Sequence, residues 1–325
     1  MKPKTPELVV VHTETRDNGP MQRRVERMLG GMNPGRVVEV DDAGLAELVR
    51  DRWSQGIPSG KGKRGTPDVL FQRWNVAADE AVEARRHEAH PEIGEFVRLR
   101  RMGSLHLRND GDLQKIRGSF CTTGWEFHSV VGCPYQCSYC GLGVGVLNVA
   151  VNIEEQIEML DHWTTLNNFQ TLYKWDNSTD INAFEPEYDA TRLFVDYFAR
   201  TPRKYLLLYT GKSANVDFML DYDHRGKTVV QWSLAPRTQA SQIEPGTAAW
   251  DDRIDSARKC QEAGYPIRFR FSPIVPVRNW RQEYAELVAE IFKKTRPDVI
   301  SLCFFGWKTA TEMQDVLHLG AKEAP

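Results

Sequence analysis

The chain has 325 residues, and its 42 basic and 44 acidic side chains leave a formal charge of -2. This balance gives no general attraction to a phosphate backbone, so a nucleic-acid partner is possible but disfavoured. No apolar run approaches the roughly 20 residues that cross a bilayer, and the N-terminus has no signal-peptide pattern. We therefore expect a cytoplasmic protein with no membrane partner.

Residues 1–115 are predicted to form a small α/β domain. Strand and helix patterns alternate in it, with strands at 6–14 and 36–40 and helices at 20–29 and 43–53. The Gly-, Pro- and Lys-rich stretch 56–68 is typical of a loop. The charged segment 79–112 is interpreted as a helix and a connection to the next domain.

Residues 116–325 are predicted to form a second domain in which strands and helices alternate regularly. Apolar, β-rich runs stand at 125–132, 171–176, 204–210, 228–235, 267–275 and 298–305. Helical patterns stand at 152–163, 191–201, 214–225, 250–264 and 283–295. Because crossovers between parallel strands are right-handed and place their helices outside, this order predicts an α/β fold with a partial (β/α)6 TIM-type barrel. Reactive groups in such folds lie at the carboxyl ends of the strands, and a cysteine-rich loop follows the first one.

That loop contains Cys133, Cys137 and Cys140, in C-x3-C-x2-C spacing. Clustered thiols in a cytosolic protein indicate metal or redox chemistry more often than disulfides. A structural zinc site has four protein ligands, and neither His128 on the preceding strand nor Cys121 is an obvious fourth. Three ligands leave an open coordination position, as catalytic metal centres do, although a zinc-stiffened loop stays an alternative.

The sequence CPYQCSYC, with Tyr139 just before the last cysteine, resembles the signature of radical S-adenosylmethionine (radical SAM) enzymes. The resemblance implies that the three cysteines hold three irons of a [4Fe-4S] cluster and that SAM chelates the fourth. It also implies that the reduced cluster cleaves SAM to a 5'-deoxyadenosyl radical, which takes a hydrogen atom from the substrate.

Further segments are similar to spore photoproduct lyases. They are QIEPGTAAWDDRIDSARKCQEAGYPIRFRFSPIVP at 242–276, WDNSTDI at 175–181, YTGKSANVD at 209–217 and QWSLA at 231–235. The resemblance covers roughly residues 116–305, and the N-terminal α/β region also has a counterpart in that family. The chain is identified as a spore photoproduct lyase-like member of the radical SAM superfamily.

The resemblance also suggests residues that bind SAM. Lys212 and Ser233 match positions that hold its amino acid part, and Ser178 with Asp180 match another such segment. A carboxylate needs a cation or hydroxyl donor, and an ammonium group needs a carboxylate acceptor. The alternatives are a solvated loop lysine, a small strand residue and a helix cap at Asp180. Tyr139 is placed near the adenine, or only packs the loop.

The chain departs from the family where hydrogen is returned to the product. Asn177 stands where those lyases have a hydrogen-donor cysteine, and Gly141 stands where they have a tyrosine. An amide holds its N–H hydrogens too strongly to replace a thiol donor. The lesion-facing hairpin at the C-terminus also has no match. Tyr139, Cys303 and Cys121 are the candidate hydrogen donors, with buried packing the alternative for Cys303.

The leading hypothesis is a radical SAM enzyme that abstracts hydrogen from an unidentified small molecule, nucleoside-like or a natural-product intermediate. Its expected partners are that substrate and a flavodoxin- or ferredoxin-type reductant. A DNA photoproduct lyase with a rearranged hydrogen-return path is the first alternative. A non-catalytic metal-binding or sensor protein is the second.

Overall fold

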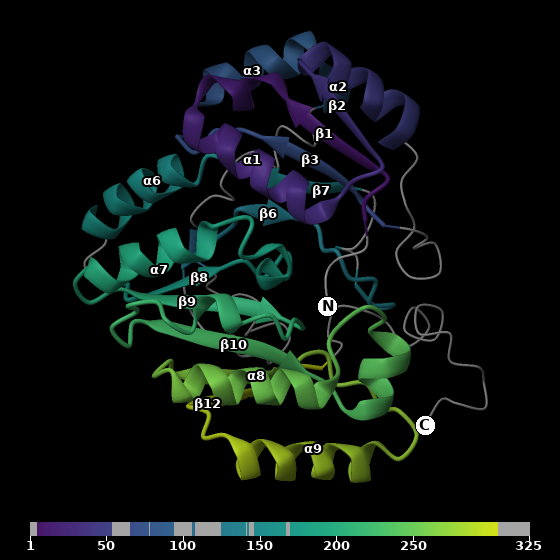
Figure 1. Ribbon diagram of the computed structural model, residues 1–325, viewed down its shortest axis with the longest axis vertical. Helices are drawn as coiled ribbons and strands as arrows, with labels where there is room; N and C mark the ends of the chain where they lie inside the picture. Colours follow the sequence, from purple (N-terminus) through teal and green to yellow (C-terminus); the bar gives the residue numbers. More distant parts are fainter. Residues whose placement is uncertain are drawn as a thin grey trace.

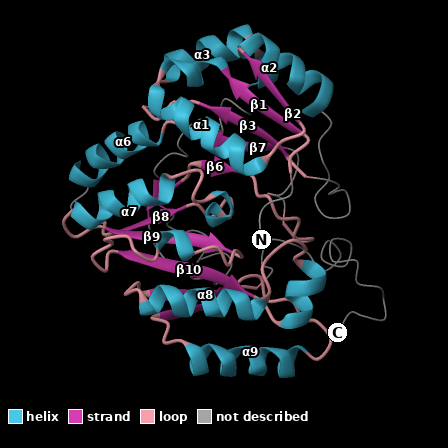
Figure 2. Ribbon diagram, viewed as in Figure 1, coloured by secondary structure: helices cyan, strands magenta, loops and turns pink. Residues whose placement is uncertain are grey.

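The computed structural model describes residues 5–53, 66–77, 79–93, 106–107, 125–140, 142, 146–166 and 170–304. Within these residues the strands form a five-stranded and a seven-stranded sheet. Figure 1 shows the smaller sheet and its helices at the top and the larger sheet below, and Figure 2 shows helices covering both.

The smaller sheet has the order β2-β1-β3-β7-β6. Its strands are β1 (Leu8–His12), β2 (Arg36–Val40), β3 (Asp68–Gln72), β6 (Val130–Val131) and β7 (Val146–Ala150). All pairs are parallel except β6 with β7. β3 and β7 were not predicted as strands, although both are short apolar runs. The predicted domain division after residue 115 stays a prediction, but the pairing adds β6 and β7 to the N-terminal sheet.

Three helices belong to this N-terminal part: α1 (Gly19–Met32), α2 (Asp42–Leu48) and α3 (Glu80–Ala89). Asp41 accepts a hydrogen bond from the backbone N–H of Gly44 at the start of α2, and Asp79 caps α3 in the same way. Both helices therefore begin at an aspartate that satisfies free N–H groups of the first turn. The predicted strands and helices of residues 6–53 are confirmed.

The larger sheet has the order β12-β11-β10-β9-β8-β5-β4. Its strands are β4 (His106–Leu107), β5 (Trp125–Phe127), β8 (Leu172–Trp175), β9 (Tyr205–Gly211), β10 (Thr228–Leu234), β11 (Ile267–Phe271) and β12 (Val299–Leu302). The six strands from β5 to β12 are parallel, and β4 is an antiparallel edge strand. The predicted six-stranded partial barrel is confirmed.

The predicted strand at 125–132 is wrong as a single element. The chain leaves the larger sheet after β5 and joins the smaller sheet at β6. Asp176, at the end of β8, fixes this turn, because its Oδ2 accepts hydrogen bonds from the Ser129 hydroxyl (2.9 Å) and N–H (3.0 Å) and from the Val130 N–H (3.3 Å).

Helices α6 (Ile153–Leu166), α7 (Ala190–Arg200), α8 (Trp250–Glu262) and α9 (Trp280–Lys294) occupy predicted positions. The predicted helix at 214–225 is wrong, because its only regular element is a 3-10 turn at Asp217–Met219. The Met219 carbonyl accepts the Tyr222 N–H at 3.2 Å and the Tyr265 hydroxyl at 2.7 Å, so a tight turn and a distant side chain take the place of the i to i+4 hydrogen bond of an α-helix. Three aspartates in the segment also disfavour a helix.

The strands of the larger sheet alternate between an apolar and a polar face. Phe127, Trp175, Trp232 and Phe269 are fully buried in the main hydrophobic core. Phe127 stacks on Trp175 with ring centroids 6.4 Å apart, and Trp175 contacts Phe194 of α7 at 4.6 Å. The residues between them on each strand face the other side, and many of these are polar or charged.

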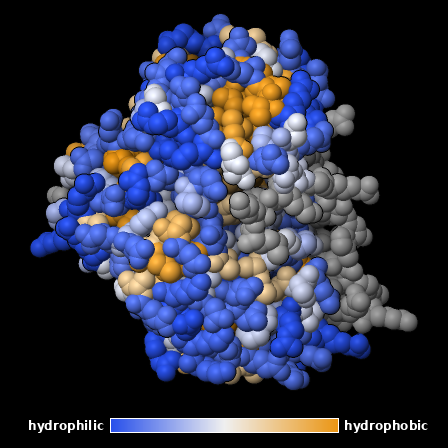
Figure 3. Space-filling model, in the orientation of Figure 1, coloured by the Kyte–Doolittle hydropathy of each residue, from blue (hydrophilic) through white to orange (hydrophobic). Residues whose placement is uncertain are grey.

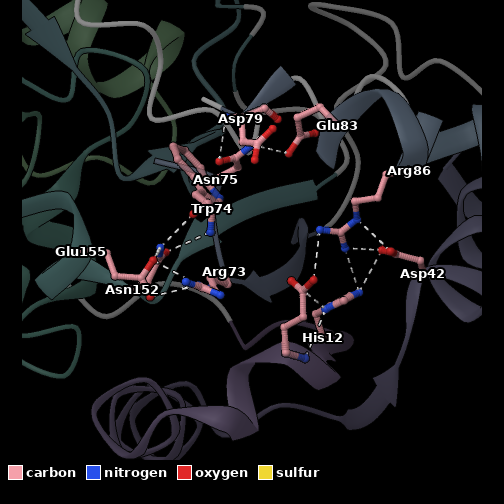
Figure 4. A network of polar contacts seen from close by, with 11 residues as sticks. His12, Asp42, Arg73, Trp74, Asn75, Asp79, Glu83, Arg86, Asn152 and Glu155 are labelled. Atoms are coloured by element: carbon pink, nitrogen blue, oxygen red, sulfur yellow. Dashed lines mark hydrogen bonds and ion pairs between the residues drawn. The ribbon is translucent and has the colours of Figure 1, made fainter. Parts of the chain in front are cut away.

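A polar network lies at the carboxyl ends of the strands of the smaller sheet (Figure 4). His12 Nε2 is 3.1 Å from Asp42 Oδ1, and Arg86 Nε donates to Asp42 Oδ2 at 2.7 Å. Burial opposes ionisation of Asp42, but these hydrogen bonds hold its pKa well below its ordinary value. Asn152 bonds both the N–H (2.9 Å) and the carbonyl (2.8 Å) of Trp74, which ties the start of α6 to the end of β3.

Among the described residues, none of the helices combines the length and the apolar character that a membrane crossing needs. The face in Figure 3 is mostly hydrophilic, and its apolar colour is confined to separate small areas.

Arg24 of α1 connects this N-terminal helix to α6 and to the segment just before α7. Its side chain is almost completely buried, and its Nε donates to the carbonyl of Tyr188 at 2.9 Å. Its Nη1 donates to the carbonyl of Val151 at 2.5 Å, and its Nη2 pairs with Glu154 of α6 at 2.9 Å. One guanidinium therefore satisfies backbone and side-chain acceptors between residues 151 and 188, which are more than 120 residues away along the chain.

We expect Arg24→Met to lower the free energy of unfolding by about 3 kcal/mol, because it leaves two buried carbonyls without donors. Arg27→Met is the matched control on the same helix, where the arginine side chain is 42% exposed. Arg27→Met should lower the free energy of unfolding by less than about 1 kcal/mol. Urea unfolding of the full chain measures both, and equal losses would contradict the assigned role of Arg24.

Candidate active site

A cavity of about 320 Å³ lies at the carboxyl ends of β8 to β11, against the cysteine loop. It is lined by Cys133, Tyr135, Cys137, Tyr139, Cys140, Leu142, Asn177, Thr179, Asp180, Tyr209, Gly211, Lys212, Ser233, Arg270, Ser272 and Pro273. The expected position of the site, at the strand ends beside the cysteines, is thus the position of this cavity.

The cysteine loop begins directly after β6 and returns through β7, so both of its ends are fixed in the smaller sheet. The Cys133 N–H donates to the carbonyl of Leu142 at 3.0 Å, and the Cys140 N–H donates to that of Cys137 at 3.0 Å. The Ser138 N–H donates to the carbonyl of Ile243 at 2.9 Å, which attaches the loop to the segment after β10. Backbone hydrogen bonds therefore hold the three thiols at one wall of the cavity.

Burial raises the pKa of Cys133 well above its ordinary value, and the neighbouring Cys137 and Asp180 add to this effect. Burial likewise raises the pKa of Cys137 to about 11. Thiolates in this position therefore need cationic metal to offset their charge. In the described part of the chain, no three His, Cys, Asp or Glu side chains are arranged around a single ion.

Glu244 lies behind the loop and connects it to the strands. Its Oε1 accepts the Tyr139 hydroxyl at 2.8 Å, and its Oε2 accepts Arg253 Nη1 at 3.0 Å. Lys212 Nζ is 4.0 Å from Oε1. Burial opposes ionisation, but Lys212 and Arg253 lower the pKa of Glu244, so it is a buried carboxylate between two cations.

The roles of Glu244 and Arg253 were not predicted. Both lie in the segment 242–276 that resembles the lyases, and Arg253 is fully buried on α8. Its Nε donates to the carbonyl of Ala248 at 2.9 Å and its Nη2 donates to Thr247 Oγ1 at 2.7 Å. The signal that was available is the pair itself, a glutamate and an arginine within the segment that resembles the lyases.

Asp180 is buried at the cavity wall. Its Oδ2 accepts the backbone N–H of Lys212, whereas its Oδ1 is buried and has no partner among the described residues. Burial raises the pKa of Asp180 to about 7, although the Lys212 N–H and charge oppose the rise. Gly211 permits the close approach, because it has φ +66° and a Cβ there would lie 2.7 Å from Asp180 Oδ2.

Lys212 points its ammonium group over the ring of Tyr139, 5.6 Å from the centroid. Its side chain is 14% exposed. Burial lowers the pKa of Lys212, but Glu244 and Cys137 raise it, and the net shift is upward. Lys212 is therefore a charged, nearly buried donor at the cavity wall, which disfavours the alternative of a solvated loop lysine.

The remaining predicted residues are divided between the cavity and its surroundings. Ser233 lines the cavity, with its Oγ 3.3 Å from the Tyr209 hydroxyl. Ser178 is not among the lining residues, and its Oγ donates to the carbonyl of Val130 at 2.8 Å. Cys303 lies behind Arg270, whose Nη2 donates to its Sγ at 3.1 Å. Cys121 and Gly141 lie outside the described residues.

Comparison with known proteins agrees with this geometry. The family model described as "Spore photoproduct lyase" matches residues 121–305. Curated spore photoproduct lyases of Geobacillus sp. (strain Y412MC61) and Bacillus subtilis (strain 168) are each 26% identical, over 69% and 52% of this chain. These matches span 68% and 51% of the two relatives, so about half to two thirds of their length.

Solved spore photoproduct lyase structures have the same fold. A mutant with bound AdoMet and dinucleoside spore photoproduct superposes with a TM-score of 0.68 at 18% identity, covering 98% of this chain and 83% of that one. A complex with dinucleoside spore photoproduct gives 0.64 at 19% identity, covering 90% and 75%. The family model matches more than half of the chain, so this protein belongs to the spore photoproduct lyase family, whose [4Fe-4S] cluster and SAM are the cofactors predicted from the cysteine loop.

Proposed function

We propose that this protein is a radical SAM enzyme that abstracts a hydrogen atom from a small-molecule substrate other than the DNA photoproduct. One observation carries the proposal: a single cavity is lined by the three cysteines, by Asp180, Lys212 and Ser233, and by Asn177 in place of a cysteine. The cysteines suit binding of the cluster and Asp180, Lys212 and Ser233 suit binding of SAM, so both groups suit generation of a radical. Asn177 does not suit the step in which that family's cysteine returns a hydrogen atom to the product.

The residues present fit the cofactors. Cys133, Cys137 and Cys140 would hold three irons of the cluster. The unpartnered Asp180 Oδ1 would accept the ammonium group of SAM, and Lys212 would bind its carboxylate. When bound and reduced, the cluster with SAM supplies a 5'-deoxyadenosyl radical for hydrogen abstraction. Glu244 holds Tyr139 in the cavity wall.

A second candidate function is photoproduct reversal by another hydrogen-return path. It is favoured by the family and by the dinucleoside photoproduct in the related structures. Cys303 is the candidate donor in that case, because its sulfur contacts Arg270 of the cavity wall. Tyr139 is the other candidate among the described residues, but its hydroxyl already donates to Glu244.

The reconstituted, dithionite-reduced enzyme is expected to form 5'-deoxyadenosine from SAM while leaving dinucleoside spore photoproduct unchanged. Chromatography of both compounds in one anaerobic reaction measures this. Cys137→Ala is the control and should lose both iron and SAM cleavage, because one cluster ligand is missing. Release of thymine nucleosides would establish the second candidate instead. Protein purified anaerobically with about one zinc and no iron would point to a non-catalytic metal protein.

Lys212→Met is expected to weaken SAM binding about tenfold or more and to leave the iron content unchanged, since a charged hydrogen bond contributes about 1.5–3 kcal/mol. Lys259→Met is the matched control, because Lys259 is 44% exposed on α8 and pairs with Asp217. Equilibrium dialysis of SAM against the cluster-loaded protein measures both. Equal SAM affinity in the two variants would remove Lys212 from the SAM site.

The cluster-free protein should lose stability as the pH rises from 5 to 8. The pKa of Asp180 is about 7 in the folded chain and 3.8 without burial, so the folded state binds the extra proton. The contribution of this proton to the free energy of unfolding is complete below the pKa of the unfolded state and is lost as the pH rises towards 7. The free energy of unfolding then falls by at most about 1.4 kcal/mol per pH unit. Urea unfolding of wild type and Asp180→Asn under reducing conditions measures it. A difference that does not vary with pH would refute the assignment.

A further inference from the structure

The polar face of β11 carries two arginines. In IRFRF, residues Ile267, Phe269 and Phe271 belong to the buried core, so Arg268 and Arg270 lie on the opposite face. Arg270 pairs in register with Ser233 of β10, and both residues line the cavity. The strict alternation of this strand was visible in the sequence, but no role was predicted for either arginine.

The guanidinium of Arg270 has only uncharged partners among the described residues. Its Nη1 donates to the Tyr209 hydroxyl at 3.1 Å, and its Nη2 donates to Cys303 Sγ at 3.1 Å. Within the same residues, it has no carboxylate inside the 4.0 Å of an ion pair. A partly buried cation without a counterion is costly, and an anion in the cavity would remove that cost.

The surrounding charges also favour an anion. Lys174 of β8 lies on the same face of the sheet, where Glu126 of β5 is its partner in register. Burial raises the pKa of Tyr209, but the charge of Arg270, the hydrogen bond with Ser233 and the charges of Lys174 and Lys212 lower it, and the net shift is downward, so three cations contribute positive potential at this hydroxyl. Lys212, the other cation among the described residues of the cavity wall, has Glu244 beside it, whereas none of the described carboxylates forms an ion pair with Arg270.

We propose that Arg270 anchors an anionic group of the substrate, a carboxylate or a phosphate, with the Tyr209 hydroxyl as a neighbouring donor. This inference rests on the proposed function and narrows its substrate class. Arginine presents two parallel N–H donors that match both groups. The anchor is one residue before the end of β11, so the bound group would lie beside the predicted SAM residue Ser233.

Inorganic phosphate is the probe, because it carries the anchored chemistry without any assumption about the rest of the substrate. Dialysis of radiolabelled phosphate against SAM-loaded holoenzyme at constant ionic strength should give saturable binding. Arg270→Gln should weaken this binding about tenfold or more, and Arg270→Lys should restore part of it. Arg258→Gln removes the same charge from a side chain of α8 that is 39% exposed, and should leave phosphate binding unchanged.

Two results would overturn the proposal. The first is phosphate binding that does not depend on Arg270: either Arg270→Gln with intact iron content binds phosphate as tightly as wild type, or the wild-type protein binds no phosphate. The second is binding that occurs only without SAM, together with weaker SAM affinity in Arg270→Gln, which would assign the arginine to the carboxylate of SAM. Formation of 5'-deoxyadenosine from SAM in the absence of substrate is measured in a separate reaction, which tests the proposed function independently of phosphate binding. An enzyme that cleaves SAM but binds no phosphate loses only this inference, and one that binds phosphate but cleaves no SAM loses only the proposed function.

Discussion

The site depends on the buried carboxylate of Glu244 between Arg253 and Lys212. A carboxylate without a cation would be too costly at this depth, and each cation without the carboxylate would be equally so. Arg253 fixes one oxygen at 3.0 Å, and the Tyr139 hydroxyl meets the other at 2.8 Å. The carbonyl of the preceding Ile243 holds the cysteine loop through Ser138. One charge cluster therefore aligns the loop from the smaller sheet with the strand ends of the larger one.

The cysteine loop is held from two sides, by the smaller sheet and by the segment that follows β10 of the larger sheet. Its flanking strands, β6 and β7, pair with the N-terminal sheet, while its tip contacts the segment after β10. Asp176 fixes the point where the chain passes from one sheet to the other, by binding the hydroxyl and N–H of Ser129. A loop held from both sides loses little entropy when it binds metal.

The sequence predicted the elements with strong periodicity and the cysteine loop, and these depend on local patterns. It missed β3 and β7, which are short runs that become strands by pairing with each other and with β1 and β6, partners that lie far away or across a loop in the sequence. It also predicted a helix at 214–225, where the Tyr265 hydroxyl, 46 residues from Met219, binds the carbonyl that a helix would use. The family resemblance suggested Asp180 as a SAM-binding residue. Its raised pKa, which burial causes, and its buried Oδ1 without a partner among the described residues are visible only in the structure.

The residues that line the cavity fall into two groups. In the first group, the three thiols, Asp180 and Lys212 are each fixed by backbone or charge, which suits a reaction shared across a family. The second group contains Asn177 and Arg270, a cation without a counterion among the described residues. A partly buried arginine without a counterion among the described residues is unfavourable in the free protein. Such a cost is maintained most simply when a bound ligand offsets it, so the specificity of this enzyme should reside in β11 and the residues after β8.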